Sequence, residues 1–268
     1  MKNILTLLFL IVAFASHAQR TMFSRQNKYL APVGPPALVT AGLVLSLDAG
    51  NASSYSGSGT TWIDLSGKGN NGTLVNSVTY NSSNQGTLVF NADATNNGSR
   101  DPYIQLPSST DFDFGAGDFT VEMWAYTTSG NPHPDFLAIN ANATAYAAIR
   151  IEYWNGNLGI LHSYDGLSHA SGGSSANFPF TLNAWSHIVI SRISGAAKVY
   201  VNGVEKASYA LTGSLMAQQN SRIGSLYPFN GYYSFSGNIA LTKFFKGRGL
   251  TASEASTHFN LTKSRFGL

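Results

Sequence analysis

Hydrophobic and polar residues alternate with a period of two over long parts of this chain, most clearly in residues 183–192. A period of two places successive side chains on opposite faces of a β-strand, whereas a helix would repeat every 3.6 residues. The two faces of this strand carry Trp185, His187, Val189 and Ser191 on one side, and Ser186, Ile188, Ile190 and Arg192 on the other.

Tight turns follow this strand and recur elsewhere in the chain. Ser194-Gly195 predicts a turn into a β-branched strand at residues 199–201, and Asn202-Gly203 predicts a hairpin into the next strand. Asn155-Gly156 gives the same signal. A type I′ turn needs positive φ at both central residues, which asparagine and glycine tolerate best. These turns indicate antiparallel pairing of neighbouring strands.

The remaining pattern predicts an all-β protein with one late helix. Thr251 and Glu254 form a capping-box motif that opens a helix at residues 252–261. Residues 131–145 are expected to form a loop. Many short strands with frequent turns predict a two-sheet antiparallel β-sandwich of jelly-roll type. Further strands are expected at residues 43–47, 74–80, 87–90, 103–106, 118–126, 147–154, 158–164, 221–224 and 235–245.

One pattern in the chain resembles the laminin-G-like branch of the concanavalin A-like lectin/glucanase superfamily. It consists of the run from Trp185 through His187 to Val189, a turn, and then residues 199–203. Residues 118–125 are similar to that family's preceding strand. The resemblance extends from about residue 43 to the end and implies the concanavalin A-like sandwich. It does not imply a ligand, because the superfamily contains lectins, glycosidases and adhesion modules. Its closing strand and C-terminal helix are matched by residues 235–241, 250–254 and 260–268.

Composition and charge point to an extracellular β-protein and away from nucleic-acid binding. Only 11% of the 268 residues are charged, against roughly a quarter in typical soluble domains. The formal net charge of +3 is small, and no cluster of lysine and arginine focuses a field on phosphates. We therefore expect no nucleic-acid partner.

The N-terminal segment predicts secretion. Residues 1–18 have a positive Lys2, an apolar stretch and a small-residue cleavage site before Gln19, which is the pattern of a signal peptide. The apolar stretch is too short for the roughly twenty residues of a membrane span, so no span is expected after cleavage. Residues 19–40 form a proline-containing leader, and residues 41–268 form the sandwich domain.

The absence of cysteine excludes disulfides, thiolate metal sites and thiol-linked lipids. A secreted domain without disulfides depends on its hydrophobic core, which a domain of this size can supply. Together with the short signal peptide, this favours a bacterial secretory route and a secreted or cell-surface location.

The polar loops offer oxygen ligands of the kind that Ca²⁺ selects. Asp64 stands before a Gly/Asn-rich loop, and we interpret it mainly as a residue that hydrogen-bonds backbone amides in Asx-turns. No cofactor is required by the sequence. The alternative is a calcium site, whose candidate ligands are Asp64, Asn70, Asp93 and Asp101.

The sequence predicts no catalytic activity. A retaining glycosidase needs two carboxylates about 5 Å apart, and none of the glutamates is followed by a second carboxylate two or four residues further along the chain. Glu122 and Glu152 lie on strands that we expect to be neighbours, so they form the alternative catalytic pair. Arg150 is expected to pair with one of them.

Sugar recognition combines aromatic rings with hydrogen-bonding groups, because a sugar ring has apolar C–H faces and polar edges. His187 lies within the family motif and is expected to be structural. Two regions of the chain combine aromatic rings with hydrogen-bonding groups. The alternative is that these tyrosine and tryptophan side chains pack within the sandwich, as they commonly do at strand spacing. The candidate ligand-binding residues are Arg150, Tyr153, Trp154, His162 and Tyr164 in the strands, and Tyr227, Asn230, Tyr232 and Tyr233 in the loop of residues 226–233.

Three functions remain open from the sequence. The leading hypothesis is a secreted, non-catalytic binding or adhesion module for glycans or a cell-surface or matrix component. The second is an assembly subunit of an extracellular filament, surface layer or particle that self-assembles through residues 19–40. The third is a glycosidase using Glu122 and Glu152.

Overall fold

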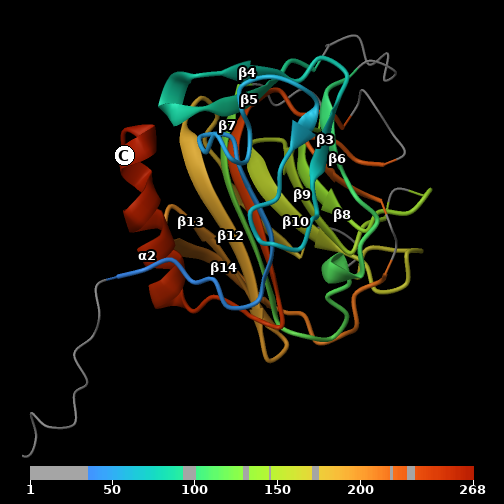
Figure 1. The fold of residues 1–268 in the computed structure, drawn as a ribbon. Helices are drawn as coiled ribbons and strands as arrows, with labels where there is room; N and C mark the ends of the chain where they lie inside the picture. Colours follow the sequence, from blue (N-terminus) through green and yellow to red (C-terminus); the bar gives the residue numbers. More distant parts are fainter. Residues whose placement is uncertain are drawn as a thin grey trace, which may run out of the picture. The chain divides into compact units, whose positions relative to one another are not determined.

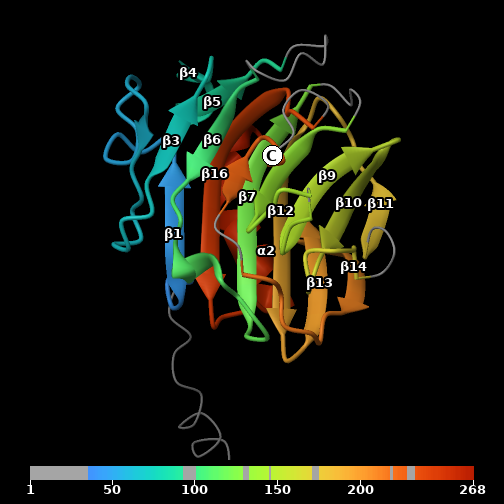
Figure 2. The same cartoon turned by 90° about the vertical axis from the view of Figure 1, so that its right-hand side faces the viewer.

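Two antiparallel sheets face each other across a hydrophobic core in the compact unit Ala37–Leu268 (Figures 1 and 2). The computed structural model describes residues 36–92, 101–128, 133–144, 146–170, 175–217, 220–227 and 233–268. The expected signal peptide, the leader up to residue 35, and the candidate ligands Asp93, Asn230 and Tyr232 lie outside these ranges. The predicted β-sandwich is confirmed.

The first sheet has the order β14-β13-β12-β7-β16-β5-β4, and β1 also pairs with β16. Its pairs are all antiparallel. The strands are β1 (Leu43–Asp48), β4 (Thr79–Asn81), β5 (Thr87–Phe90), β7 (Phe119–Thr127), β12 (Trp185–Ile193), β13 (Ala196–Val201), β14 (Val204–Ala210) and β16 (Gly237–Lys246).

The second sheet has the order β11-β10-β9-β8-β15-β6-β3-β2 and is also antiparallel. Two short 3₁₀ turns, η1 (Ser83–Gln85) and η2 (Thr110–Phe112), lie in the connections. The strands are β2 (Thr61–Trp62), β3 (Gly72–Val75), β6 (Tyr103–Leu106), β8 (Asp135–Ile139), β9 (Ile149–Trp154), β10 (Asn157–His162), β11 (Ala176–Pro179) and β15 (Ser221–Ile223).

Strand β8 is the main departure from the expected strands. It occupies the segment that was expected to be a loop, and all of its residues are buried. A short strand buried on both faces has no alternation to reveal it. As a result β7 and β9 are not neighbours: β7 pairs with β12 and β16, whereas β9 pairs with β8 and β10.

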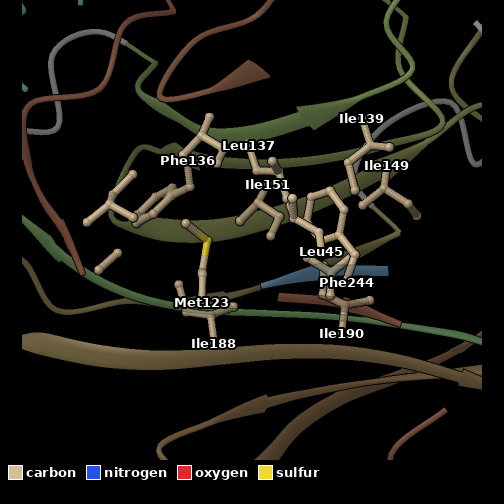
Figure 3. Close-up of a cluster of buried hydrophobic side chains, with 14 of the residues drawn as sticks. Leu45, Met123, Phe136, Leu137, Ile139, Ile149, Ile151, Ile188, Ile190 and Phe244 are labelled. Atoms are coloured by element: carbon tan, nitrogen blue, oxygen red, sulfur yellow. The ribbon is translucent and has the colours of Figure 1, made fainter. Parts of the chain in front are cut away.

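The core lies between the sheets, where apolar side chains from both interdigitate (Figure 3). Met123, Ile188 and Ile190 project into the core from the first sheet, and Leu137 and Ile151 project into it from the second. The Ile188 and Ile190 side of β12 therefore faces inward, and the His187 side faces outward. Burial of such side chains supplies most of the stability of a domain that has no disulfide.

The predicted turns have the expected backbone. Asn155 and Gly156 have φ values of 48° and 87°, and Asn202 and Gly203 have values of 52° and 75°. These positive values close the hairpins β9–β10 and β13–β14. Ser194-Gly195 turns β12 into β13 in the same way, with φ values of 50° and 78°.

Helix α2 (Ala252–Thr262) lies on the side of the first sheet that faces away from the second sheet (Figure 1). Its predicted capping box is present, because Thr251 and Glu254 hydrogen-bond each other's backbone amides. The helix continues into the 3₁₀ turn η3 (Lys263–Phe266). The ring of Phe266 stacks on Trp124 of β7 with centroids 4.1 Å apart.

A buried hydrogen-bond triad fixes α2 to the sheet. Glu122 of β7 accepts from His187 Nε2 at 3.0 Å and from His258 Nδ1 of α2 at 2.9 Å, and all three side chains are fully buried. His258 Nε2 in turn accepts the backbone N–H of Val39 at 2.8 Å. Burial opposes ionisation of Glu122, but Lys243 and the two histidine hydrogen bonds outweigh it and hold the pKa well below its usual range. His187 is therefore structural, as predicted.

Glu122→Gln is expected to lower the free energy of unfolding at pH 7 by about 3 kcal/mol, because it breaks a buried charged network. A carboxylate with a lowered pKa stabilises the fold above its ordinary pKa of 4.5, and this contribution is lost as the pH falls further. The difference between wild type and variant should therefore shrink below pH 4.5. Chemical denaturation across the acid range measures both effects.

The matched control is Glu205→Gln, because Glu205 pairs with Lys198 at the surface, where ion pairs contribute little. Equal effects of the two substitutions, or a Glu122→Gln loss that does not change with pH, would contradict the structural role of the triad.

Candidate functional site

The outer face of the second sheet brings together several of the charged and aromatic residues that the sequence suggested as ligand-binding candidates. Along β9, Ile149, Ile151 and Tyr153 point into the core. Because side chains alternate along a strand, Arg150, Glu152 and Trp154 point outward. This assigns the two faces of β9, which the sequence pattern could not do.

Arg150 is the centre of a buried ionic network on this face. Its Nε and Nη2 donate to the two carboxylate oxygens of Asp135 on β8, at 2.8 and 3.0 Å. Nη2 also lies 2.7 Å from Glu152 Oε2. The expectation that Arg150 pairs with one of the two glutamates is confirmed. Because one arginine serves two carboxylates, the network carries excess negative charge when both are ionised.

Burial is the main influence on the pKa values of Asp135 and Glu152. It raises the pKa of Asp135 to about 7, although Arg150 opposes the shift. Burial also raises the pKa of Glu152, again against Arg150. Desolvation disfavours a charged carboxylate more strongly than the nearby cation favours it. The network therefore changes its protonation near neutral pH.

Aromatic rings surround the network. The Tyr233 ring lies under the Arg150 guanidinium, with 4.6 Å between the guanidinium carbon and the ring centroid. Trp154 stacks on His133 with centroids 3.4 Å apart and planes 2° from parallel. Burial and Arg150 lower the pKa of His133 to about 4, so the imidazole is neutral at pH 7. Trp154 remains 46% exposed and presents apolar ring surface to solvent.

A second arginine lies across the same face. Arg222 of β15 and Arg150 are both register partners of Ala138 on β8, so they flank it on one face. Arg222 lies over Tyr103 at 4.2 Å and Tyr227 at 5.0 Å. Its Nε donates to Gln105 at 3.2 Å, which holds the guanidinium in place between the rings.

The loop tyrosines reach the sheet because the loop is anchored by an apolar contact. Leu226 is fully buried in a cluster with Ala138, Ala141 and Ala147, and Tyr227 and Tyr233 pack against it. The small alanine side chains, one on β8 and two between β8 and β9, leave room for Leu226. The described ends of this loop are thereby held against the outer face of the second sheet.

The structure brings together only part of the predicted ligand-binding set. Arg150, Trp154, Tyr227 and Tyr233 share the outer face of the second sheet. Tyr153 points into the core, and Tyr164 packs against its edge. Two further members, Asn230 and Tyr232, lie outside the described residues.

His162 also faces inward and is buried. Its Nδ1 lies 2.7 Å from the Ser175 hydroxyl, and its ring stacks with Tyr209. Burial is the main reason that its pKa is lowered to about 4. His162 is therefore a neutral interior residue at pH 7 and does not share the outer face with Arg150.

Four members of this face were not predicted: Asp135, His133, Arg222 and Tyr103. Asp135 and His133 lie in the segment that was expected to be a loop, where the apolar run at residues 136–139 was the available signal. Arg222 lies in a strand of three residues, which is too short to show alternation. Its outward direction follows from pairing with Ala138 and Gln105.

The catalytic pair considered from the sequence is not formed. Glu122 belongs to the first sheet and contacts α2, whereas Glu152 lies on the outer face of the second sheet. The expectation that these strands are neighbours was wrong because β8 intervenes in sequence and pairs with β9. The two carboxylates therefore lie on opposite sides of the sandwich.

Asp64 forms the predicted Asx-turn. One carboxylate oxygen accepts the amides of Ser46 and Ser66 at 2.8 and 2.9 Å, and the other accepts the Ser66 hydroxyl and the Asn70 amide at 2.7 and 3.0 Å. The Asn70 side chain donates to Val44 and Asp111. A cation here would have to displace these donors, so the arrangement fits a turn and does not fit a calcium site.

Asp101 is buried just before β6. Across the described ranges, no group of three or more histidine, aspartate or glutamate side chains is arranged to hold a metal. Within the same ranges, no helix has the length and apolar character needed to cross a bilayer.

Two antiparallel sheets packed as a sandwich with one C-terminal helix are the architecture of a concanavalin A-like domain. A family model described as "Concanavalin A-like lectin/glucanases superfamily" matches residues 96–256. The chain belongs to this superfamily, in its Laminin_G_3 family. The resemblance inferred from the sequence is confirmed. No curated protein sequence matches the chain at a significant level.

Solved structures with the same fold include toxin binding domains. The binding domain of botulinum neurotoxin DC in complex with SialylT has a TM-score of 0.64 and 14% identity, over 83% of this chain and 52% of that one. A second structure is of botulinum neurotoxin type C, a toxin described as dependent on interaction with two ganglioside molecules for cell entry. It has a TM-score of 0.61 and 14% identity, over 82% of this chain and 51% of that one.

The binding domain of Paraclostridial Mosquitocidal Protein 1 has a TM-score of 0.60 and 18% identity, over 82% of this chain and 52% of that one. The chain thus spans about half the length of the structures that it matches. At these identities the likeness establishes the fold.

Arg150→Met is expected to lower the free energy of unfolding at pH 8 by about 3 kcal/mol, because it leaves buried Asp135 without its cation. With the pKa of Asp135 raised from 3.8 to about 7, its contribution to stability is greatest below pH 3.8 and is lost as the pH rises through 7. The loss caused by Arg150→Met should therefore be smaller at pH 4. Thermal and urea unfolding measure it.

The double variant Arg150→Met/Asp135→Asn should recover part of the loss, since it removes the stranded charge. Lys198→Met, at a surface ion pair, is the control and should have little effect. Simple additivity of the two single substitutions would contradict a coupled network.

Proposed function

We propose that this chain is a secreted, non-catalytic carbohydrate-binding module that engages glycans with the outer face of its second sheet. The observation that carries the proposal is the half-exposed Trp154 ring beside the Asp135–Arg150–Glu152 network. An exposed indole and the polar edge of the network fit the apolar C–H face and the hydroxyl edge of one sugar ring.

The rigidity of the face supports this role. Arg150 is held by two carboxylates and by Tyr233, and Trp154 is held by His133. Side chains that are already fixed lose little conformational entropy when a ligand binds. His133, which stacks on Trp154, is neutral at pH 7, so the stacked pair itself carries no charge.

The carboxylates of this face are poorly placed for glycoside hydrolysis, which supports a binding role. Both oxygens of Asp135 accept from Arg150, and the side chain has no exposed surface. A nucleophile or general acid must reach the glycosidic bond. Glu152 alone cannot supply the two roles that the reaction needs.

The toxin binding domains offer a parallel for this proposal. Two of them are described with SialylT and with ganglioside molecules. We extend to this chain only the class of ligand, a cell-surface glycan. The secreted location rests on residues 1–18, whose pattern is that of a signal peptide. We infer no requirement for calcium or another cofactor.

Trp154→Ala is expected to weaken binding to an immobilised glycan by about tenfold or more, since loss of a stacked ring costs roughly 1–2 kcal/mol. The assay uses the chain from residue 19 on an array of acidic and neutral oligosaccharides, with and without chelator. Ile63→Ala is the matched control, because Ile63 is 47% exposed and Trp154 is 46% exposed.

Glycan binding that is equal in wild type and Trp154→Ala would place the site elsewhere, and no binding to any oligosaccharide would refute the proposal. Hydrolysis of the same oligosaccharides, lost on Glu152→Gln, would instead establish an enzyme.

A further inference from the structure

A small polar pocket opens on the outer face of the first sheet, on the opposite side of the sandwich from Trp154. Its volume is about 250 Å³, and we call it the asparagine pocket. Its walls come from five strands and the turn η1. The lining includes Asn81, Asn84, Thr87, Tyr126, Trp185 and Asn238.

Strand register explains why these residues meet. Tyr126 of β7 is the direct partner of Trp185 on β12 and of Asn238 on β16. Side chains of register partners lie on the same face of a sheet, so the three form one row. Thr87 of β5 and Asn81 of β4 are also partners and form the adjoining wall.

Contacts behind the pocket hold its walls in place. The Trp185 ring packs on Phe266 with centroids 4.6 Å apart and on Tyr126 at 5.7 Å. Asn84 Nδ2 donates to the Arg265 carbonyl at 3.0 Å, and Arg265 Nε donates to the Asn84 carbonyl at 2.7 Å. The C-terminal turn η3 thus fixes both the indole and η1, so the pocket is formed before any ligand arrives.

The chemistry of the lining selects an uncharged ligand. The lining side chains are amides, hydroxyls and aromatic rings, and none carries a charge. Within the described residues, the side-chain amide of Asn238, the Tyr126 hydroxyl and the Trp185 indole N–H form no hydrogen bond with protein. Asn81 uses only its side-chain oxygen, which accepts from the Ser83 amide at 2.8 Å.

Amides offer both donors and acceptors, which matches the vicinal hydroxyls of a sugar, and the rings match its C–H surface. A volume of about 250 Å³ is below the usual range for drug-sized ligands, so one ring fits better than an extended chain. We propose that the asparagine pocket is a second binding site, specific for a single neutral sugar unit.

This site is independent of the glycan site on the second sheet. If both are occupied, the domain holds two glycans on opposite sides and can link neighbouring chains or raise avidity on a dense surface.

The test is a titration of the isotope-labelled chain, from residue 19, with neutral methyl glycosides and N-acetylglucosamine, followed by amide chemical shifts. We expect saturable shifts near residues 81–87, 126, 185 and 238, with millimolar dissociation constants typical of one small ring. Sialic acid should not produce them, because the pocket has no cation to receive its carboxylate.

The double variant Asn81→Ala/Asn238→Leu should weaken binding by about tenfold or more, since it removes two hydrogen-bonding amides. Asn177→Ala, on the exposed part of edge strand β11, is the control and should bind like wild type. Because Asn238 is partly buried, Asn81→Ala alone is measured as well, with an unchanged melting temperature as the criterion for intact folding.

Trp154→Ala separates the two sites: it should leave these shifts unchanged. Shifts at the asparagine pocket that survive in the double variant would overturn the proposal, as would the absence of shifts there with every neutral sugar. Loss of the shifts in Trp154→Ala but not in Asn81→Ala would also overturn it, and would assign neutral sugars to the second sheet.

Discussion

The buried contact between Glu122 and the two histidines determines which faces of this sandwich are available. Glu122 joins β7 to β12 through His187 and to α2 through His258. A charged group without water is tolerated only when its hydrogen bonds are satisfied, so the helix cannot leave the sheet without stranding the carboxylate. Val39 closes the arrangement by donating to His258. The chain from residue 37 onward is thereby tied to the domain.

This constraint has consequences for both outer faces. On the first sheet, α2 and η3 cover the middle and bring Phe266 against Trp124 and Trp185, and the asparagine pocket opens at one end. On the second sheet no described helix lies over the strands, and that face carries Arg150, its carboxylates and a half-exposed tryptophan. The two faces differ in chemistry: one presents a charged network with stacked rings, and the other presents neutral amides. We propose that these two surfaces recognise different parts of a glycan.

The fold was largely predictable because its signals are local. Alternation around His187, the Asn-Gly turns and the Thr251–Glu254 capping box each depend on a few neighbouring residues. The site was only partly predictable because its key contacts join distant segments. Asp135 lies in a strand buried on both faces, which shows no alternation, and its omission made β7 and β9 appear adjacent. His162 and Tyr153 were chosen by residue type, but the register of the second sheet turns them inward.

The central claim is that the outer face of the second sheet binds glycans. Hydrogen–deuterium exchange of the chain with and without a series of acidic and neutral oligosaccharides tests it most directly, because it reports every segment at once. The account predicts slower exchange in residues 133–139 and 149–154 with at least one oligosaccharide, and no change in α2. Protection that appears in α2 and not in these strands, or no protection with any oligosaccharide, would contradict it.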